Sequence, residues 1–428
     1  MSKSPKKTRT LRATTLQVVA LGAALAATWT LTPQLVRAQA THTSQDWAQS
    51  PAAFDDGDGL RDFQTRLRSA LFLLKGQPQI QQPLKLSGTV TAVSRTGIRR
   101  LRIRDFQLLS DGRREAGEFN LGAGSWPSVV GALGSALAGD YLVQAAIKGI
   151  PIDNLEVVFT SKPGTAPSQT TGTQVTYPRN LQYVVFIQSP ATDAQLEDLR
   201  STVERVSPVF RLVTEAQKVE HGKLVYTKTP LKREGKTLDG LREFLTDTNA
   251  SRQGATPVEG PSPKPAADDW RQPLRAHIKV EGSTGIRHVR TDIGNFQVIH
   301  DYPRYLGGHN LGPVPEEDIL GRMITCLTHI YEIEASRRQI KLDGLELNVE
   351  GTLTSRLGNI DTPPVYKDIA YTVNIASPET KETIEELQKA VEAVCPIYNM
   401  IKDSQPIKST IIRGPYAEEK EQAAIAGK

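Results

Sequence analysis

A glycine-rich loop runs directly into a helix in residues 305–326, YLGGHNLGPVPEEDILGRMITC. Proline is favoured in the first turn of a helix, so we expect this helix to begin at Pro315 and to extend to about residue 338. Strand patterns precede the loop, as a hairpin in residues 276–292 and a further strand in residues 296–301. The helix is therefore entered from a β-hairpin and a strand.

A second set of strands and a second helix follow. Alternating polarity predicts strands in residues 342–353 and 365–376, and apolar residues on one face predict a helix in residues 378–394. Strands followed by a helix, twice, without a strict alternation of single strands and helices, indicate an α+β fold.

The same motifs occur twice in the chain, in the same order. The identities include TGIR at 96–99 and 284–287, NLG at 120–122 and 310–312, LE at 155–156 and 345–346, and VE at 203–204 and 391–392. We predict a tandem duplication of one domain. Residues 81–235, the first segment, are the degenerate copy, and residues 271–415, the second segment, are the other copy.

Composition divides the rest of the chain. Residues 41–80 are a polar N-terminal segment that ends in an amphipathic helix, because leucine and phenylalanine recur there at three- and four-residue spacing. Residues 236–270 are predicted to be a helix followed by a Pro/Gly-rich linker, and residues 416–428 a C-terminal tail.

The N-terminus has the pattern of an export signal. Residues 1–12 carry five basic side chains and no acid, an apolar stretch follows, and Ala38-Gln39-Ala40 is a small-x-small ending. This order predicts a signal peptide in residues 1–40, cleaved after Ala40, and a periplasmic or secreted protein with no membrane span after cleavage. Removing residues 1–40 leaves 46 basic and 47 acidic residues, so net charge gives no reason to expect a nucleic-acid partner.

The two segments differ at positions that carry chemistry. Both cysteines, Cys326 and Cys395, lie in the second segment, and their counterparts in the first are Ala136 and Ser207. The acid at the helix start, Glu316, corresponds to Trp126.

These residues resemble the OsmC/organic hydroperoxide resistance (Ohr) family. Its motifs are a Gly-Gly loop, a Pro-Glu at a helix start, a cysteine ten residues later and a distant Cys-Pro, and they occur here at Gly307, Pro315, Cys326 and Cys395. The resemblance implies two tandem OsmC-like domains, each a β-sheet with two long helices. It also implies cysteine-based reduction of organic hydroperoxides, without a cofactor or a metal.

The resemblance further implies a set of site residues. Cys326 lies on an apolar helix face, where burial raises a thiol pKa, so a thiolate there needs a cation nearby. The family supplies an arginine from the first hairpin, held by the helix-start glutamate, and these would be Arg287 and Glu316. Cys326 would form a sulfenic acid, Cys395 would condense with it, and an external dithiol would reduce the disulfide.

Other interpretations of these residues stay open. Cys326 and Cys395 can be buried apolar side chains or a structural disulfide in a non-catalytic envelope protein that binds a small hydrophobic ligand or a partner. Arg290 and Arg322 are rivals of Arg287, and the first segment has Arg99 at the matching place. Glu316 can simply be a favourable charge at a helix N-terminus, and His329 lacks the second ligand pair that a metal site needs.

Single-domain relatives in this family form intertwined homodimers with active sites near the interface. Two copies in one chain are therefore expected to pack as an intramolecular pseudo-dimer in a monomer. The first segment would then supply one wall of the site.

Overall fold

The computed structural model describes residues 59–75, 77, 82–93, 96–112, 118–231, 240–252, 274–292, 296–355 and 363–427. These residues belong to one compact unit, residues 54–428. The predicted signal peptide lies outside them. The fold is α+β, as predicted, with two six-stranded sheets.

The described elements of the first segment and of its flanking helices are α2 (Leu60–Leu74), β1 (Leu84–Val93), β2 (Ile98–Ile103), β3 (Phe106–Ser110), α3 (Ser125–Lys148), β4 (Asn154–Pro167), β5 (Gln174–Gln188), α4 (Asp193–Val206), α5 (Pro208–Thr214), β6 (Lys223–Lys228) and α6 (Leu241–Arg252). Those of the second segment and the tail are β7 (Leu274–Val280), β8 (Arg287–Thr291), β9 (Gln297–His300), η4 (Arg304–Leu306), α7 (Pro315–Arg337), β10 (Gly344–Leu353), β11 (Tyr366–Ser377), α8 (Lys381–Val394), α9 (Pro396–Lys402), β12 (Ile407–Arg413) and α10 (Glu418–Ala426).

Most predicted elements of the second segment are confirmed. The hairpin is β7 and β8, the strand before the loop is β9, and the long helix is α7. Helix α8 begins three residues later than predicted because Thr380 caps it, accepting the backbone N–H of Thr383 on its side-chain oxygen at 3.2 Å.

Each sheet combines strands from both segments, so the expectation that each copy forms its own sheet is wrong. One sheet has the order β3-β2-β1-β10-β11-β6 and the other β12-β5-β4-β7-β8-β9. The central pairings have matching registers, because Val90 faces Leu347 across β1 and β10, and Ile278 faces Val157 across β7 and β4. The hairpin of each segment thus extends the sheet of the other.

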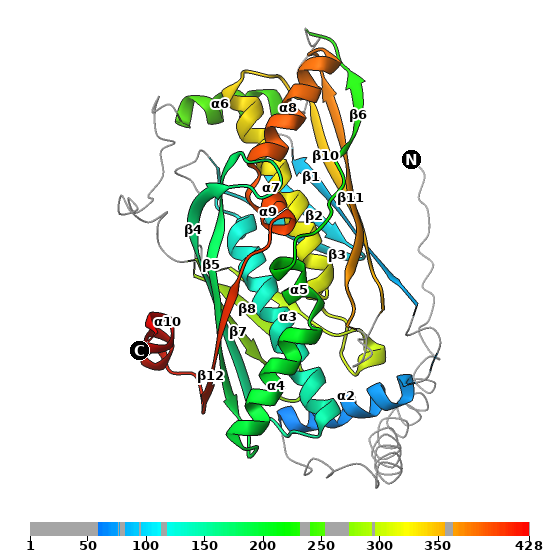
Figure 1. The fold of residues 1–428 in the computed structure, drawn as a ribbon. Coiled ribbons are helices and arrows are strands. Elements are labelled where there is room, and N and C mark those ends of the chain that lie inside the picture. The colour runs from blue at the N-terminus through cyan, green and yellow to red at the C-terminus, as the bar shows by residue number, and fades with distance from the viewer. Residues whose placement is uncertain are drawn as a thin grey trace, which may run out of the picture. The chain divides into compact units, whose positions relative to one another are not determined.

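Helices α3 and α7 pack on each other between the two sheets (Figure 1). Helix α7 lies on β1, β2 and β10, whereas α3 lies on β4, β7 and β8. By length and composition α3 could cross a membrane, but most of it is buried within the protein, as is usual for a core helix.

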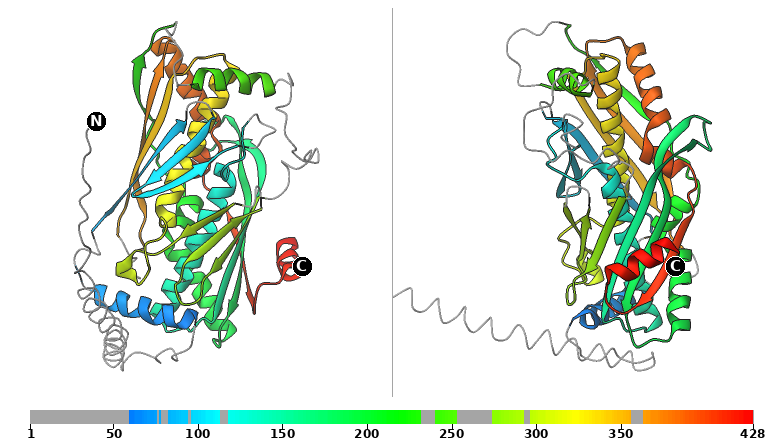
Figure 2. Two further views of the ribbon diagram at one scale, coloured as in Figure 1. Left: turned by 180° about the vertical axis from the view of Figure 1, so that it is seen from behind. Right: turned by 90° about the vertical axis from the view of Figure 1, so that its left-hand side faces the viewer.

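The two flanking helices occupy corresponding places at opposite ends of this arrangement. Helix α2 packs on α3 and α6 packs on α7 (Figure 2). Each inserts one aromatic ring against a hairpin turn. Gly97 has φ 61°, and a Cβ there would lie 2.0 Å from Cζ of Phe244, whereas a Cβ on Gly285, with φ 71°, would lie 2.3 Å from Cε1 of Phe63. Glycine is therefore required at both turns.

We expect Phe63→Ala and Phe244→Ala each to lower the free energy of unfolding by about 3–5 kcal/mol, because each removes a buried ring that fills a turn. Urea denaturation of the purified chain measures this change. Phe72→Ala is the matched control, since Phe72 lies on α2 but is 47% exposed, and its cost should stay within about 0.5 kcal/mol. Equal costs for all three variants would contradict the packing described.

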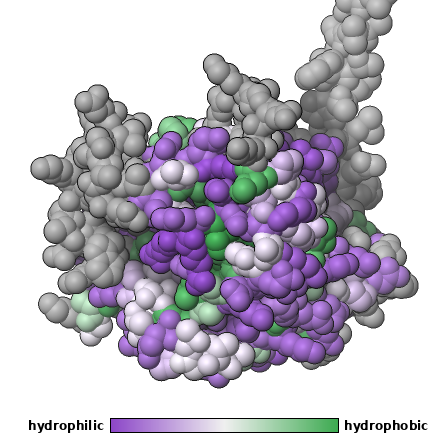
Figure 3. Space-filling view, turned by 90° about the horizontal axis from the view of Figure 1, so that it is seen from above, coloured by the Kyte–Doolittle hydropathy of each residue, from purple (hydrophilic) through white to green (hydrophobic). Residues whose placement is uncertain are grey.

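The end of the molecule that carries α6 and α8 presents a mainly hydrophilic surface (Figure 3). Apolar side chains appear there only in small separate patches on the described part of that face. Isolated apolar side chains of this kind are normal on protein surfaces.

Candidate functional site

The two cysteines lie side by side in the interior. Cys326 is in the middle of α7, and Cys395 stands between α8 and α9, directly before Pro396. Both are buried free thiols, and they lie close enough for each to shift the pKa of the other. Pro396 is the first residue of α9, where its missing N–H costs no helix hydrogen bond. The backbone of Ile397 interacts with both thiols, and that of Tyr398 with Cys395.

The surroundings divide the two thiols into a more acidic and a less acidic one. Burial alone would raise the pKa of Cys326, but hydrogen bonds from Cys395, the Ile397 backbone and Ser125, and the charge of Arg99, together lower it. Burial raises the pKa of Cys395, and its contact with Cys326 raises it further. Cys326 is therefore the more acidic thiol of the pair.

The cation of this site is Arg99, at the start of β2. Its side chain is 1% exposed, and its guanidinium is held by two carboxylates. Nη2 donates to Glu118 at 2.9 Å, and Nη1 donates to Glu332 at 2.6 Å and to the carbonyl oxygen of Gly97 at 3.0 Å. Nε of Arg99 has no hydrogen-bond partner among the described residues.

A histidine connects this ion-pair network to the surface. His329, one turn beyond Cys326 on α7, lies 2.7 Å from Glu118 through Nε2, and its side chain is about one-quarter exposed. Burial would raise the pKa of Glu118, but the charges and hydrogen bonds of His329 and Arg99 lower it well below its usual range. Glu118 is therefore ionised and fixes the position of Arg99.

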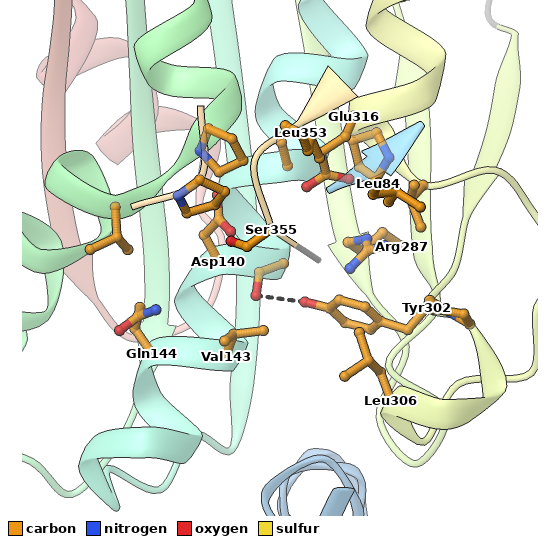
Figure 4. A pocket seen from close by; sticks show the side chains of 18 of the residues that line it. Leu84, Asp140, Val143, Gln144, Arg287, Tyr302, Leu306, Glu316, Leu353 and Ser355 are labelled. Carbon is orange, nitrogen blue, oxygen red and sulfur yellow. Dashed lines mark hydrogen bonds between the residues drawn. The ribbon is translucent and has the colours of Figure 1, made fainter. Parts of the chain in front are cut away.

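Arg287 and Glu316 lie together, but in a different place from the cysteines. They line a pocket with Asp140 and Tyr302, and Figure 4 shows these side chains pointing toward one another. Ala136, the counterpart of Cys326, also lines this pocket. The structure thus brings Cys326 to Cys395 and Arg287 to Glu316, but separates the two pairs.

The exchange of hairpins between the sheets explains this separation. Arg99 belongs to a hairpin that packs on α7, which carries Cys326. Arg287 belongs to the corresponding hairpin, which packs on α3, where Ala136 replaces the cysteine. Of the other two candidates, Arg290 is exposed and Arg322 is paired with Asp318 at 2.9 Å.

Three acidic or polar residues of this site were not predicted from the sequence. Glu118, Glu332 and Ser125 correspond to Gly308, Leu142 and Pro315 of the other segment. An acid in one segment that aligns with a glycine or a leucine in the other is a signal that the sequence offers. If such a carboxylate is buried, it needs a nearby cation, and so it can mark a site. Over the residues that the structure describes, no cluster of three or more potential metal ligands occurs.

Comparison with known proteins gives one family match and a weak structural match. A solved structure of an OsmC-like protein from Mycoplasma pneumoniae aligns with 31% of this chain and 90% of its own chain, at 20% identity and a TM-score of 0.25. No curated protein matches the chain. A family model, OsmC-like protein, matches residues 308–410. Residues 308–410, which contain Cys326 and Cys395, are therefore an OsmC-like domain.

Proposed function

We propose that the chain is a thiol peroxidase that reduces organic hydroperoxides through Cys326 and Cys395. The observation that carries this proposal is the buried contact between two free thiols whose pKa values are shifted in opposite directions beside an arginine. A peroxide-reactive cysteine must be a thiolate, and its partner must supply the second thiol of a disulfide.

The proposed reduction of the hydroperoxide has three steps. The Cys326 thiolate attacks the terminal peroxide oxygen, the O–O bond breaks, and the leaving alkoxide takes a proton to give an alcohol and a sulfenic acid. Cys395 then attacks the sulfenic sulfur, and water leaves as the disulfide forms. An external dithiol reduces the disulfide by thiol exchange and is itself oxidised.

Arg99 is assigned the electrostatic role in this scheme, in place of Arg287. Its charge favours the Cys326 thiolate, and Glu118 and Glu332 hold its guanidinium from two sides. A fixed cation lowers the energy of negative charge on the departing oxygen without any reorganisation. Glu316, which lies with Arg287, has no part in this step.

We also propose that the two segments arose by tandem duplication and pair within one chain as a pseudo-dimer. The internal sequence identities and the matching strand orders of the two sheets support this origin. Because Arg99 and Ser125 come from the first segment, the site is complete only with both segments present. We further propose that the chain acts as a monomer and is exported by its N-terminal signal.

The direct test is a single-turnover assay with the reduced chain. Mixed with one equivalent of cumene hydroperoxide, it should consume the peroxide, lose two titratable thiols and gain one intramolecular disulfide. A dithiol should then restore both thiols and allow further turnover. Two thiols that persist after the peroxide treatment, or a disulfide that dithiols cannot reduce, would reject the peroxidase and leave a non-catalytic protein.

A further inference from the structure

The pocket at Arg287 has no thiol, yet it is built around a buried cation. It is a cavity of about 100 Å³ between α3, the start of α7 and the hairpin that carries Arg287 (Figure 4). Its polar lining includes Arg287, Asp140, Glu316 and Tyr302, together with Gln144 and Ser355. Part of its wall is apolar, including Leu84, Val143, Leu306 and Leu353.

Arg287 is 1% exposed, and two of its N–H groups lack a partner. Nε and Nη2 make no hydrogen bond with the described residues, and the guanidinium carbon lies 4.2 Å from the centre of the Tyr302 ring. These two nitrogens share one edge of the planar guanidinium, the edge that binds a carboxylate through two parallel hydrogen bonds. A buried donor without a partner is unfavourable, and a suitable acceptor would remove this cost.

Arg99, which matches Arg287 in the sequence, differs from it in its carboxylate partners. Arg99 is held by Glu118 and Glu332, whereas the counterparts of these acids in the pocket of Arg287 are Gly308 and Leu142. The two carboxylates that neutralise Arg99 are thus absent around Arg287. Gly139 gives the guanidinium room, since a Cβ there would lie 2.7 Å from Nη1.

The two acids that do line the pocket are shifted toward their neutral forms. Burial raises the pKa of Asp140 to about 8, with a further contribution from the charge of Glu316. Burial also raises the pKa of Glu316, against the opposing charge of Arg287. At neutral pH Asp140 is therefore protonated and can donate a hydrogen bond to an incoming oxygen.

We propose that this pocket binds the carboxylate of a short-chain organic acid, held by the free edge of Arg287 with the alkyl chain against the apolar wall. A planar carboxylate matches that edge, whereas a phosphate dianion would bring two charges to a single cation beside two acids. Since an apolar cavity of 150 Å³ accepts benzene, this one fits an acid of about three to five carbons.

Isothermal titration of the full reduced chain with sodium butyrate tests the proposal, without any peroxide present. Butyrate should bind saturably, and butan-1-ol and inorganic phosphate should bind at least about tenfold more weakly, the difference expected for charge-assisted hydrogen bonds. Phosphate binding as tight as butyrate, or no butyrate binding, would overturn it. Either result leaves the thiol chemistry unaffected, because no cysteine takes part.

Two variants test the pocket in different ways, one by removing its cation and one by filling its cavity. Arg287→Gln removes the cation and should weaken butyrate at least about tenfold. Ala136→Leu keeps every charge but fills the cavity from α3, and should block binding as well. If the first variant fails to fold, as judged by circular dichroism, the second still decides. Butyrate bound with unchanged affinity by a folded variant of either kind would refute the assigned site.

Discussion

Cys326→Ser should abolish the reduction of cumene hydroperoxide, with a second-order rate constant at least about 10³-fold lower than that of the native chain. The serine hydroxyl fits the same buried space but stays protonated at neutral pH, so the surroundings that lower the pKa of Cys326 have no thiolate to stabilise. Peroxide loss followed under pseudo-first-order conditions measures the effect.

Cys395→Ser is the matched variant, because it makes the same replacement of sulfur by oxygen at the neighbouring thiol. It should still reduce one equivalent of peroxide, but the product should stop at the sulfenic acid of Cys326, which dimedone traps and mass spectrometry detects. No disulfide should form, and dithiol-dependent turnover should fall. If Cys326→Ser kept the first reduction and Cys395→Ser lost it, the roles of the two thiols would be reversed.

Local pattern was sufficient for the elements of the fold. Pro315 begins α7 as the sequence predicts, and the hairpin of β7 and β8 turns where glycine allows a positive φ. Each of these signals lies within a few residues, where propensity and capping act directly.

The pairing between segments could not be obtained in the same way. β1 and β7 have similar patterns, so either one could extend the sheet of its own segment or that of the other. Only long-range packing selects β1 with β10 and β7 with β4. An alternating pattern specifies which face of a strand is buried, and it does not identify the neighbouring strand.

This ambiguity explains the arginine that the sequence interpretation chose. TGIR occurs identically at 96–99 and 284–287, so the motif cannot distinguish Arg99 from Arg287. The cysteines were expected to take an arginine from their own segment. The exchange of hairpins gives them Arg99 instead, together with Glu118, whose significance is visible only once β2 lies on α7.

Arg99→Gln should lower the rate of peroxide reduction by about 10²–10³-fold, the usual cost of removing one preorganised donor at a developing negative charge. It should also destabilise the chain by about 3–5 kcal/mol, because Glu118 and Glu332 are left buried without their cation. Arg100→Gln is the control, since Arg100 neighbours Arg99 on β2 but points outward and is exposed. It should change neither quantity appreciably.

A double variant separates the two effects of Arg99. In Arg99→Gln with Glu332→Gln, one positive and one negative charge are removed together, so the buried charge is balanced again and Glu118 keeps its contact with His329. Thermal stability should recover by several degrees relative to Arg99→Gln, whereas peroxide reduction should stay about 10²-fold below that of the native chain. If stability and activity recovered together, Arg99 would have only a structural role. If the loss appeared in Arg287→Gln instead, the cation assigned from the sequence alone would be the one that acts on Cys326.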